Sequence, residues 1–152
     1  MRFHLIDRIE AIWPGQSLRA RKLTSISETF WAEGPSGPEM PGYLILEALC
    51  QAGSWLVLES TGRRRRAALL SVGSVEIGDP VRPGEVLTLN VTTNGGIGQD
   101  TAVVSGTVQV GDRVVLRATD VMCALIDADE LEAAEHTSIM GAVLGATVEA
   151  AA

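Results

Sequence analysis

The chain has 152 residues, of which 46% are apolar and 4% aromatic, and its formal net charge is −7. This length suits one domain, and the apolar fraction excludes a chain that is disordered throughout. The acidic balance argues against a general nucleic-acid binder, because that function needs a basic surface to neutralise phosphates.

The cysteines and the first residues indicate a compartment. Cys50 and Cys123 form no CxxC pair and histidine is scarce, so we expect no metal site. Charges at Arg2, Asp7 and Arg8 interrupt the start too early for a signal peptide. No run of about 18 uncharged apolar residues predicts a membrane span. We therefore expect a cytoplasmic protein with reduced thiols that binds neither membrane nor nucleic acid.

The first part of the chain predicts two strands. Residues 5–13 form the first, ending at the turn signal Pro14-Gly15, and residues 17–27 form the second. The segment 33–42 is rich in Gly and Pro, so we expect a loop there.

A helix is predicted over residues 43–59, because the stretch is long and rich in Leu and Ala. Pro41 suits its start and Thr61-Gly62 suits its end. The stretch is apolar on every side, which predicts a helix buried on every side.

Four more strands follow, over residues 67–77, 85–93, 100–110 and 113–126. Asn94-Gly95-Gly96 and Gly111-Asp112 are predicted hairpin turns. This order predicts an α+β fold, in which an antiparallel sheet curls around one long central helix.

Glu47 stands in the middle of the apolar helix, where a carboxylate is costly to bury. Such a group is a candidate functional residue, although a structural ion pair is an equal alternative. Gln51 lies one turn further along the same face, so the two side chains can share a polar pocket.

Residues 40–52, with the sequence MPGYLILEALCQA, resemble the MPG-x-L-x-x-E-A-x-x-Q-x segment of FabZ-type β-hydroxyacyl-[acyl-carrier-protein] dehydratases. Residues 3–9 resemble that family's F-L-L-V-D-R-V strand, residues 79–87 its R-P-V-x-P-G-D-x-L turn, and residues 108–124 its last hairpin. The resemblance implies a hotdog domain over residues 1–126, followed by a tail over 127–152 that is a short helix or flexible.

The resemblance also implies a lyase activity. Water is eliminated from a β-hydroxyacyl thioester carried on the phosphopantetheine of an acyl-carrier protein, in fatty-acid or polyketide-type synthesis, without another cofactor. A His acts as base, a Glu on the helix of the partner subunit helps the hydroxyl leave, and a backbone N–H at the helix start polarises the thioester carbonyl. Glu47 and Gly42 match the last two positions. The family's site lies between two subunits whose sheets join edge to edge.

The family His does not match. Its pattern G-H-F-P-G-x-P-x-M-P-G places Glu33 at the His position, while His4 falls in the first predicted strand and His136 in the tail. Three alternatives remain: Glu33 replaces the His as base, the chain is the Glu-bearing half of a heterodimer, or dehydration is lost. The last leaves a thioesterase or a non-catalytic module that binds an acyl carrier or partner.

The remaining candidates belong to the substrate pocket and to docking. The resemblance places Trp31, Met40, Pro41, Tyr43 and Gln51 around the acyl group. Arg63, Arg64, Arg65 and Arg66 are either a solvated loop or a docking patch for an acidic carrier protein.

Overall fold

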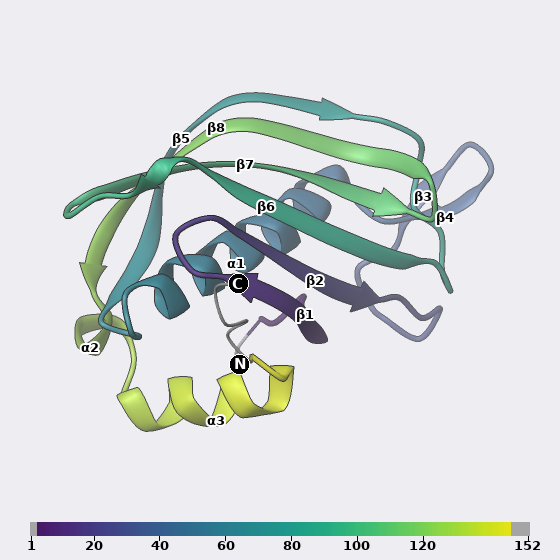
Figure 1. Ribbon diagram of the computed structural model, residues 1–152. Coiled ribbons are helices and arrows are strands. Elements are labelled where there is room, and N and C mark those ends of the chain that lie inside the picture. Colours follow the sequence, from purple (N-terminus) through teal and green to yellow (C-terminus); the bar gives the residue numbers. More distant parts are fainter. Residues whose placement is uncertain (1–2, 147–152) are drawn as a thin grey trace.

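A six-stranded antiparallel sheet curls around one long helix, as Figure 1 shows. The computed structural model describes residues 3–146. The helix is α1 (Gly42–Ser60), and the strand order in the sheet is β1-β2-β6-β7-β8-β5. The strands are β1 (Arg8–Trp13), β2 (Ser17–Leu23), β5 (Arg65–Ile77), β6 (Val86–Ile97), β7 (Thr101–Val110) and β8 (Arg113–Asp127). The predicted hotdog architecture is confirmed.

The first strand begins later than predicted, at Arg8 instead of residue 5, so His4 lies before the sheet. The reason is a side chain that takes the place of a neighbouring strand. The backbone N–H of Leu5 donates to Gln51 Oε1, and the carbonyl of Phe3 accepts from Gln51 Nε2, both at 2.9 Å.

The second strand ends at Leu23, four residues earlier than predicted. The hydroxyl of Thr24 donates to the carbonyl of Glu85 at 2.6 Å, and a turn follows in which the N–H of Glu28 donates to the carbonyl of Ser25. These local bonds satisfy the backbone outside the sheet.

Two further corrections concern glycine-rich segments. The predicted loop 33–42 contains a small hairpin, β3 (Ala32–Gly34) and β4 (Gly37–Glu39), because Gly37 adopts a positive φ that closes the turn. The predicted turn at residues 94–96 lies inside β6 instead. Gly95 and Gly96 have positive φ at a break in the β6–β7 register, and the turn falls at residues 98–100.

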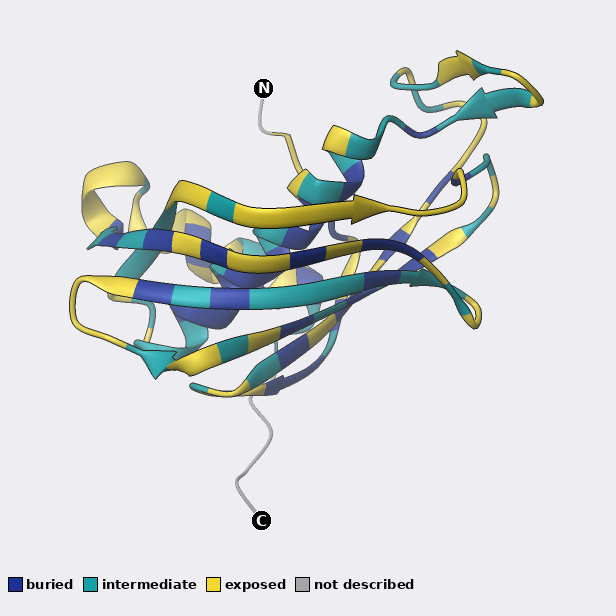
Figure 2. Ribbon diagram, turned by 90° about the horizontal axis from the view of Figure 1, so that it is seen from above, coloured by how far each residue is buried: buried dark blue, intermediate teal, exposed yellow. Residues whose placement is uncertain are grey.

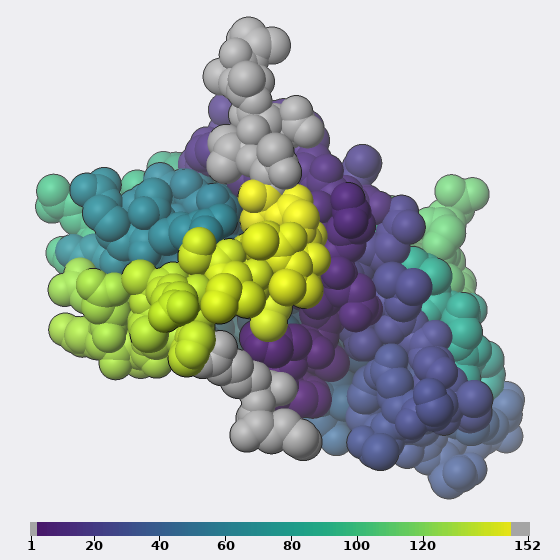
Figure 3. All heavy atoms as spheres, turned by 90° about the horizontal axis from the view of Figure 1, so that it is seen from below, coloured from purple at the N-terminus to yellow at the C-terminus, as the bar shows by residue number. Residues whose placement is uncertain are grey.

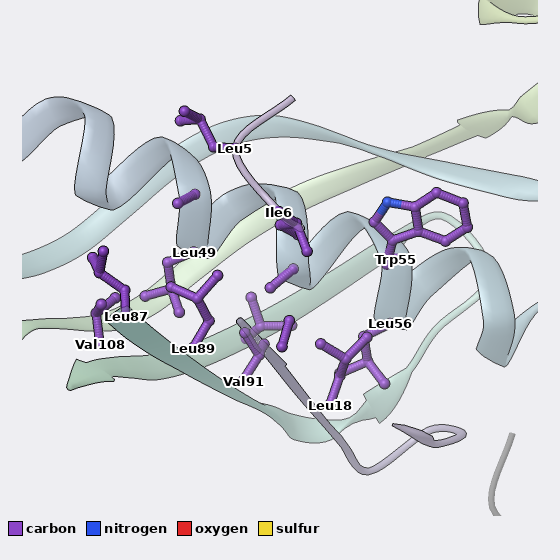
Figure 4. Close-up of a cluster of buried hydrophobic side chains, with 14 of the residues drawn as sticks. Leu5, Ile6, Leu18, Leu49, Trp55, Leu56, Leu87, Leu89, Val91 and Val108 are labelled. Carbon is purple, nitrogen blue, oxygen red and sulfur yellow. The ribbon is translucent and has the colours of Figure 1, made fainter. Parts of the chain in front are cut away.

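The core lies between α1 and the concave face of the sheet (Figure 4). Leu49, Trp55 and Leu56 of the helix pack against side chains from β2, β6 and β7, among them Leu18, Leu89, Val91 and Val108. The prediction that α1 is buried on every side was wrong. The sheet covers only part of its circumference, so Tyr43 is 72% exposed and Glu47 is also exposed.

Replacing Leu56 with Ala is expected to lower the free energy of unfolding by about 2–5 kcal/mol, because Leu56 is fully buried and its removal leaves a cavity. Urea denaturation followed by circular dichroism measures the loss. Leu131→Ala is the matched control, since Leu131 is 57% exposed and should change stability by less than about 0.5 kcal/mol. Equal losses in the two variants would contradict this account of the core.

The segment after β8 forms two helices, α2 (Ala128–Leu131) and α3 (Ala134–Leu144), and α3 lies against the N-terminal part of the chain (Figure 3). Arg66 holds this segment through bonds from Nη2 to Glu132 Oε2 and Thr137 Oγ1, each 2.6 Å long. Most of the described part of the predicted tail is thus helical, although Asp127 still belongs to β8, and residues 147–152 lie outside the described residues. Within residues 3–146, no helix is long and apolar enough to cross a membrane.

Candidate active site on the open face of α1

The uncovered face of α1 carries polar side chains at helical spacing, which places them along one line. They border a cavity of about 210 Å³ between the helix and the sheet. The helix contributes Glu47, Cys50, Gln51, Gly53, Ser54 and Val57 to its lining. The strands contribute Ala67 and Leu69 from β5, Val104 from β7, and Val121 and Cys123 from β8.

The cavity has a polar end and an apolar end. Glu47 and Leu69 are exposed and lie where the cavity opens to solvent, whereas Val57 and Cys123 are buried. Ten residues separate Glu47 from Val57, which is about 15 Å along a helix. A largely apolar space that opens beside a carboxylate suits a ligand with a polar head and an alkyl chain.

Gln51 fixes the carboxylate of Glu47. Its Nε2 donates to Glu47 Oε1 at 3.0 Å and to the carbonyl of Phe3, while its Oε1 accepts from the N–H of Leu5. Both amide hydrogens are therefore used, and the backbone of residues 3 and 5 sets the orientation of the amide. The structure thus brings Glu47 and Gln51 together at one polar site.

Cys50 lies one turn from Glu47 and lines the same cavity. Burial, followed by the negative charge of Glu47 and the nearby Cys123, raises the pKa of its thiol from 9.0 to about 11. Burial also raises the pKa of Cys123. Both thiols therefore stay protonated near neutral pH and are poor nucleophiles there.

Alkylation of Cys50 is expected to be slow at pH 8, about a hundredfold slower than for a thiol with a pKa of 9, because only the thiolate reacts. The rate should rise about tenfold per pH unit until the pH approaches 11. Iodoacetamide labelling of a Cys123→Ser variant, followed by mass spectrometry, gives the profile. Adding Glu47→Gln should shift it to lower pH, because that substitution removes a charge that opposes ionisation. A rate that levels off below pH 9 would contradict the burial of this thiol.

Glu33 lies in a different place from Glu47. It is an exposed residue of the β3–β4 hairpin and lines a second pocket at the start of α1, with Glu39, Met40, Gly42 and Asp79. This second pocket and the cavity beside Glu47 share no residue. Within one chain, the structure therefore does not bring the two carboxylates together.

The other predicted pocket residues divide between core and surface. Met40 is buried, and its N–H donates to the carbonyl of Val81. Pro41 and Gly42 start α1, at the positive end of the helix dipole. Tyr43 points to solvent, and the indole N–H of Trp31 donates to the carbonyl of Ser25 at 2.9 Å. Neither Tyr43 nor Trp31 lines the cavity.

The four arginines after α1 have partners within the protein. Arg63 pairs with Glu59 at 2.7 Å, Arg65 with Asp127 at 3.1 Å and Arg66 with Glu132 at 2.6 Å. Arg64 donates to the carbonyl of Thr61 at 3.0 Å and is exposed. Much of their charge is therefore used to hold the C-terminal segment and the end of α1.

Several lining residues were not identified from the sequence. Ser54 follows Glu47 by seven residues, which is two helical turns, so periodicity was a usable signal for this residue, whereas Gly53 and Val57 lie further around the helix, toward the sheet. The strand residues Val104 and Cys123 gave no such signal, because their distance to α1 depends on how the sheet curls.

The chain is similar to known dehydratases over most of its length. The family model described as "FabA-like domain" matches residues 1–119. The 3-hydroxyacyl-[acyl-carrier-protein] dehydratase FabZ of Roseiflexus castenholzii is 40% identical over 106 residues, which cover 66% of this chain and 74% of the relative. The FabZ of a Caulobacter species is 35% identical over 120 residues, covering 76% and 73%. For the FabZ of Zymomonas mobilis, the match is 38% over 91 residues, covering 57% of this chain and 58% of the relative.

Solved structures with the same fold are more distant. The smu.793 protein of Streptococcus mutans, bound to acetyl CoA, has a TM-score of 0.63 at 19% identity, covering 82% of this chain and 92% of that one. The dehydratase heterocomplex ApeI:P of Xenorhabdus doucetiae has a TM-score of 0.62 at 14% identity, covering 90% and 88%. These likenesses show the fold alone.

Matches to several curated relatives span about three fifths of the relative's length. The family model nevertheless covers most of this chain, and longer matches at similar identity extend over nearly three quarters of other FabZ proteins. The chain therefore belongs to the FabA-like domain family, as a FabZ-type hotdog dehydratase homologue.

Proposed function

We propose that this protein acts on β-hydroxyacyl or enoyl thioesters carried by the phosphopantetheine of an acyl-carrier protein, in fatty-acid or polyketide-type synthesis. The observation that carries the proposal is the position of Glu47. Its carboxylate, oriented by Gln51, stands at the open end of an apolar cavity. The alkyl part of a thioester would occupy the cavity, with its C3 hydroxyl beside Glu47.

The proposed reaction is the elimination of water. A base removes the proton from C2, the C2–C3 double bond forms, and the C3–O bond breaks. The Glu47 carboxyl, which carries a proton in the proposed substrate complex, gives that proton to the departing oxygen, which leaves as water. The thioester carbonyl gains negative charge during proton removal, and the N–H of Gly42, at the positive end of α1, is the proposed donor to it.

We propose that the base comes from a second subunit, because Glu33 of the same chain lines a different pocket. Two sources fit: Glu33 of a second copy, or a His of another hotdog chain. We favour the His, because an imidazole is better matched to proton transfer near neutral pH than a carboxylate. The ApeI:P protein, which has a similar fold, is described as a heterocomplex, and this supports a mixed pair.

The edge strand β5 supports such an association. It pairs with β8 on one side and forms one edge of the sheet. Figure 2 shows it as a largely exposed strand. Leu69, Leu70 and Ile77 are more than half exposed on this strand, which is unfavourable for an edge that stays in water. We propose that two hotdog sheets join at β5 and that the open face of α1 is then covered by the partner.

Docking of the carrier protein is proposed at the arginines of residues 63–66. Arg64 is exposed and donates to a backbone carbonyl, and within residues 3–146 it forms no ion pair with a carboxylate. An acidic carrier protein would be attracted to such a charge, and the effect on the association rate would weaken with salt.

The test is an incubation of the pure protein with β-hydroxyacyl and enoyl pantetheine thioesters, with water loss or addition followed by mass spectrometry. Turnover only after a His-bearing hotdog homologue is added would select the heterodimer and exclude Glu33 as base. Turnover by the protein alone that is lost in Glu33→Gln would select the homodimer. Release of free thiol would instead select a thioesterase, and binding without any reaction would select a non-catalytic acyl-binding module.

A further inference from the structure

Gly53 is an unusual glycine in this protein. Of the sixteen glycines, eight have a positive φ, and at seven others an added Cβ would lie within 3.0 Å of another atom. Gly53 has neither property. It lies inside α1, and the atoms nearest to a Cβ added there would be Val104 Cγ2 at 3.5 Å and Val91 Cγ1 at 3.9 Å. These are ordinary packing distances.

Glycine lowers the stability of a helix interior relative to alanine, because its backbone loses more conformational freedom on folding. At Gly106, glycine is required, since a Cβ would lie 2.5 Å from the carbonyl oxygen of Asn90. At Gly53, neither backbone conformation nor steric exclusion requires it. A glycine that lowers helix stability at position 53 therefore needs another explanation, and its place in the wall of the cavity provides one.

Gly53 lines the cavity six residues beyond Glu47, which is about 9 Å along the helix. An added methyl group would point toward Val104, which lines the cavity from the sheet. It would therefore reduce the space between Gly53 and Val104, two residues that line the cavity from opposite elements.

We infer that Gly53 determines the length of acyl chain that the cavity accepts, an inference that rests on the proposed action on acyl thioesters. A closed apolar cavity of about 150 Å³ holds one benzene ring. The cavity here is about 210 Å³. The part of the cavity that this chain forms by itself thus has room for an alkyl segment on the order of six to eight carbons. The substrate class is a straight, medium-length acyl thioester, and Gly53 keeps its path open.

The experiment measures binding of S-butyl, S-octyl and S-dodecyl pantetheine thioethers, which cannot react, by titration calorimetry on the full chain and its variants. The same variants are assayed with β-hydroxyacyl thioesters of matching length. Wild type should prefer octyl to butyl and dodecyl. In Gly53→Ala, the octyl-to-butyl ratio of affinities should fall about tenfold, the effect of one methylene in a fitted apolar pocket.

One further measurement on Gly53→Ala and two further variants accompany this ratio of affinities. Gly53→Ala should also melt about 1–4 °C higher than wild type, because alanine favours the helix. Cys123→Ala enlarges the opposite wall of the cavity and should improve dodecyl binding. Ser138→Ala, on the exposed side of α3, is a control for stabilisation by helix propensity alone and should leave the length preference unchanged.

The results separate this inference from the proposed reaction. A length preference that shifts in Gly53→Ala supports the inference even if no variant eliminates water. Turnover with an unchanged length preference in Gly53→Ala overturns the inference and leaves the proposed function standing. Failure of wild type to bind any of the thioethers overturns the inference as well.

Discussion

The Glu47→Gln variant is expected to lose about 10²–10⁴-fold in turnover of β-hydroxyacyl thioesters, measured with the partner that supports wild-type turnover. Glutamine keeps the size and the polar contact with Gln51, but it cannot give a proton to the departing hydroxyl. Because Glu47 is exposed in the single chain, the substitution should not affect folding. Thermal unfolding by circular dichroism checks this, and turnover is followed by mass spectrometry.

The matched control is Glu59→Gln, the same substitution three turns further along α1. Glu59 pairs with Arg63 and does not line the cavity, so its loss should leave turnover unchanged. Turnover by Gln51→Ala should lie between the values for these two variants, with about a tenfold loss, because the substitution removes the hydrogen bond that orients the Glu47 carboxylate. An active Glu47→Gln variant would remove Glu47 from the mechanism.

A lysine in place of Leu70 is expected to convert the associated protein to a monomer and to lower turnover at least a hundredfold. Leu70 is 58% exposed on the edge strand β5, and a lysine on an edge strand opposes pairing with another sheet. Turnover should fall together with association, because the proposed base belongs to the second subunit. Size-exclusion chromatography with light scattering measures the oligomeric state, and the assay described for Glu47→Gln measures turnover.

Leu131→Lys is the control for this experiment. Leu131 is 57% exposed on α2, so the substitution adds the same charge at an equally exposed leucine that is not part of the edge strand. It should change neither the oligomeric state nor turnover. A Leu70→Lys monomer that retains full activity would show that the site is complete within one chain.

Local patterns predicted most of the secondary structure. The helix predicted at residues 43–59 is α1, and the strands predicted at 67–77, 100–110 and 113–126 correspond to β5, β7 and β8. These elements are long and carry a clear periodicity, which is the strongest signal in a sequence. The errors lie at ends and turns. The first strand was predicted from residue 5 but begins at Arg8, because the Gln51 side chain bonds the preceding backbone, and sequence periodicity does not reveal such a bond.

Some features of the candidate site could likewise be predicted from local sequence, and others could not. Glu47 and Gln51 could be paired from the sequence because residues four apart on a helix lie side by side, and the 3.0 Å hydrogen bond follows from that spacing. Glu33 was aligned with a family position, but its place in space depends on the β3–β4 hairpin, and the structure puts it in another pocket. The arginines at 63–66 are a charge run in the sequence, yet three of them pair with acids, two of which lie more than sixty residues away.

The sequence by itself determined a central helix with Glu47 and Gln51 on one face, strands around it and a FabZ-type signature. It could do so because these features depend on neighbours within a few residues. The tertiary structure alone decided that Glu47 stands open at a cavity mouth instead of being buried, and that Gly53 leaves space in front of Val104. The reason is physical: exposure and empty volume depend on which distant strands reach the helix, and β5, β7 and β8 leave one side of it uncovered.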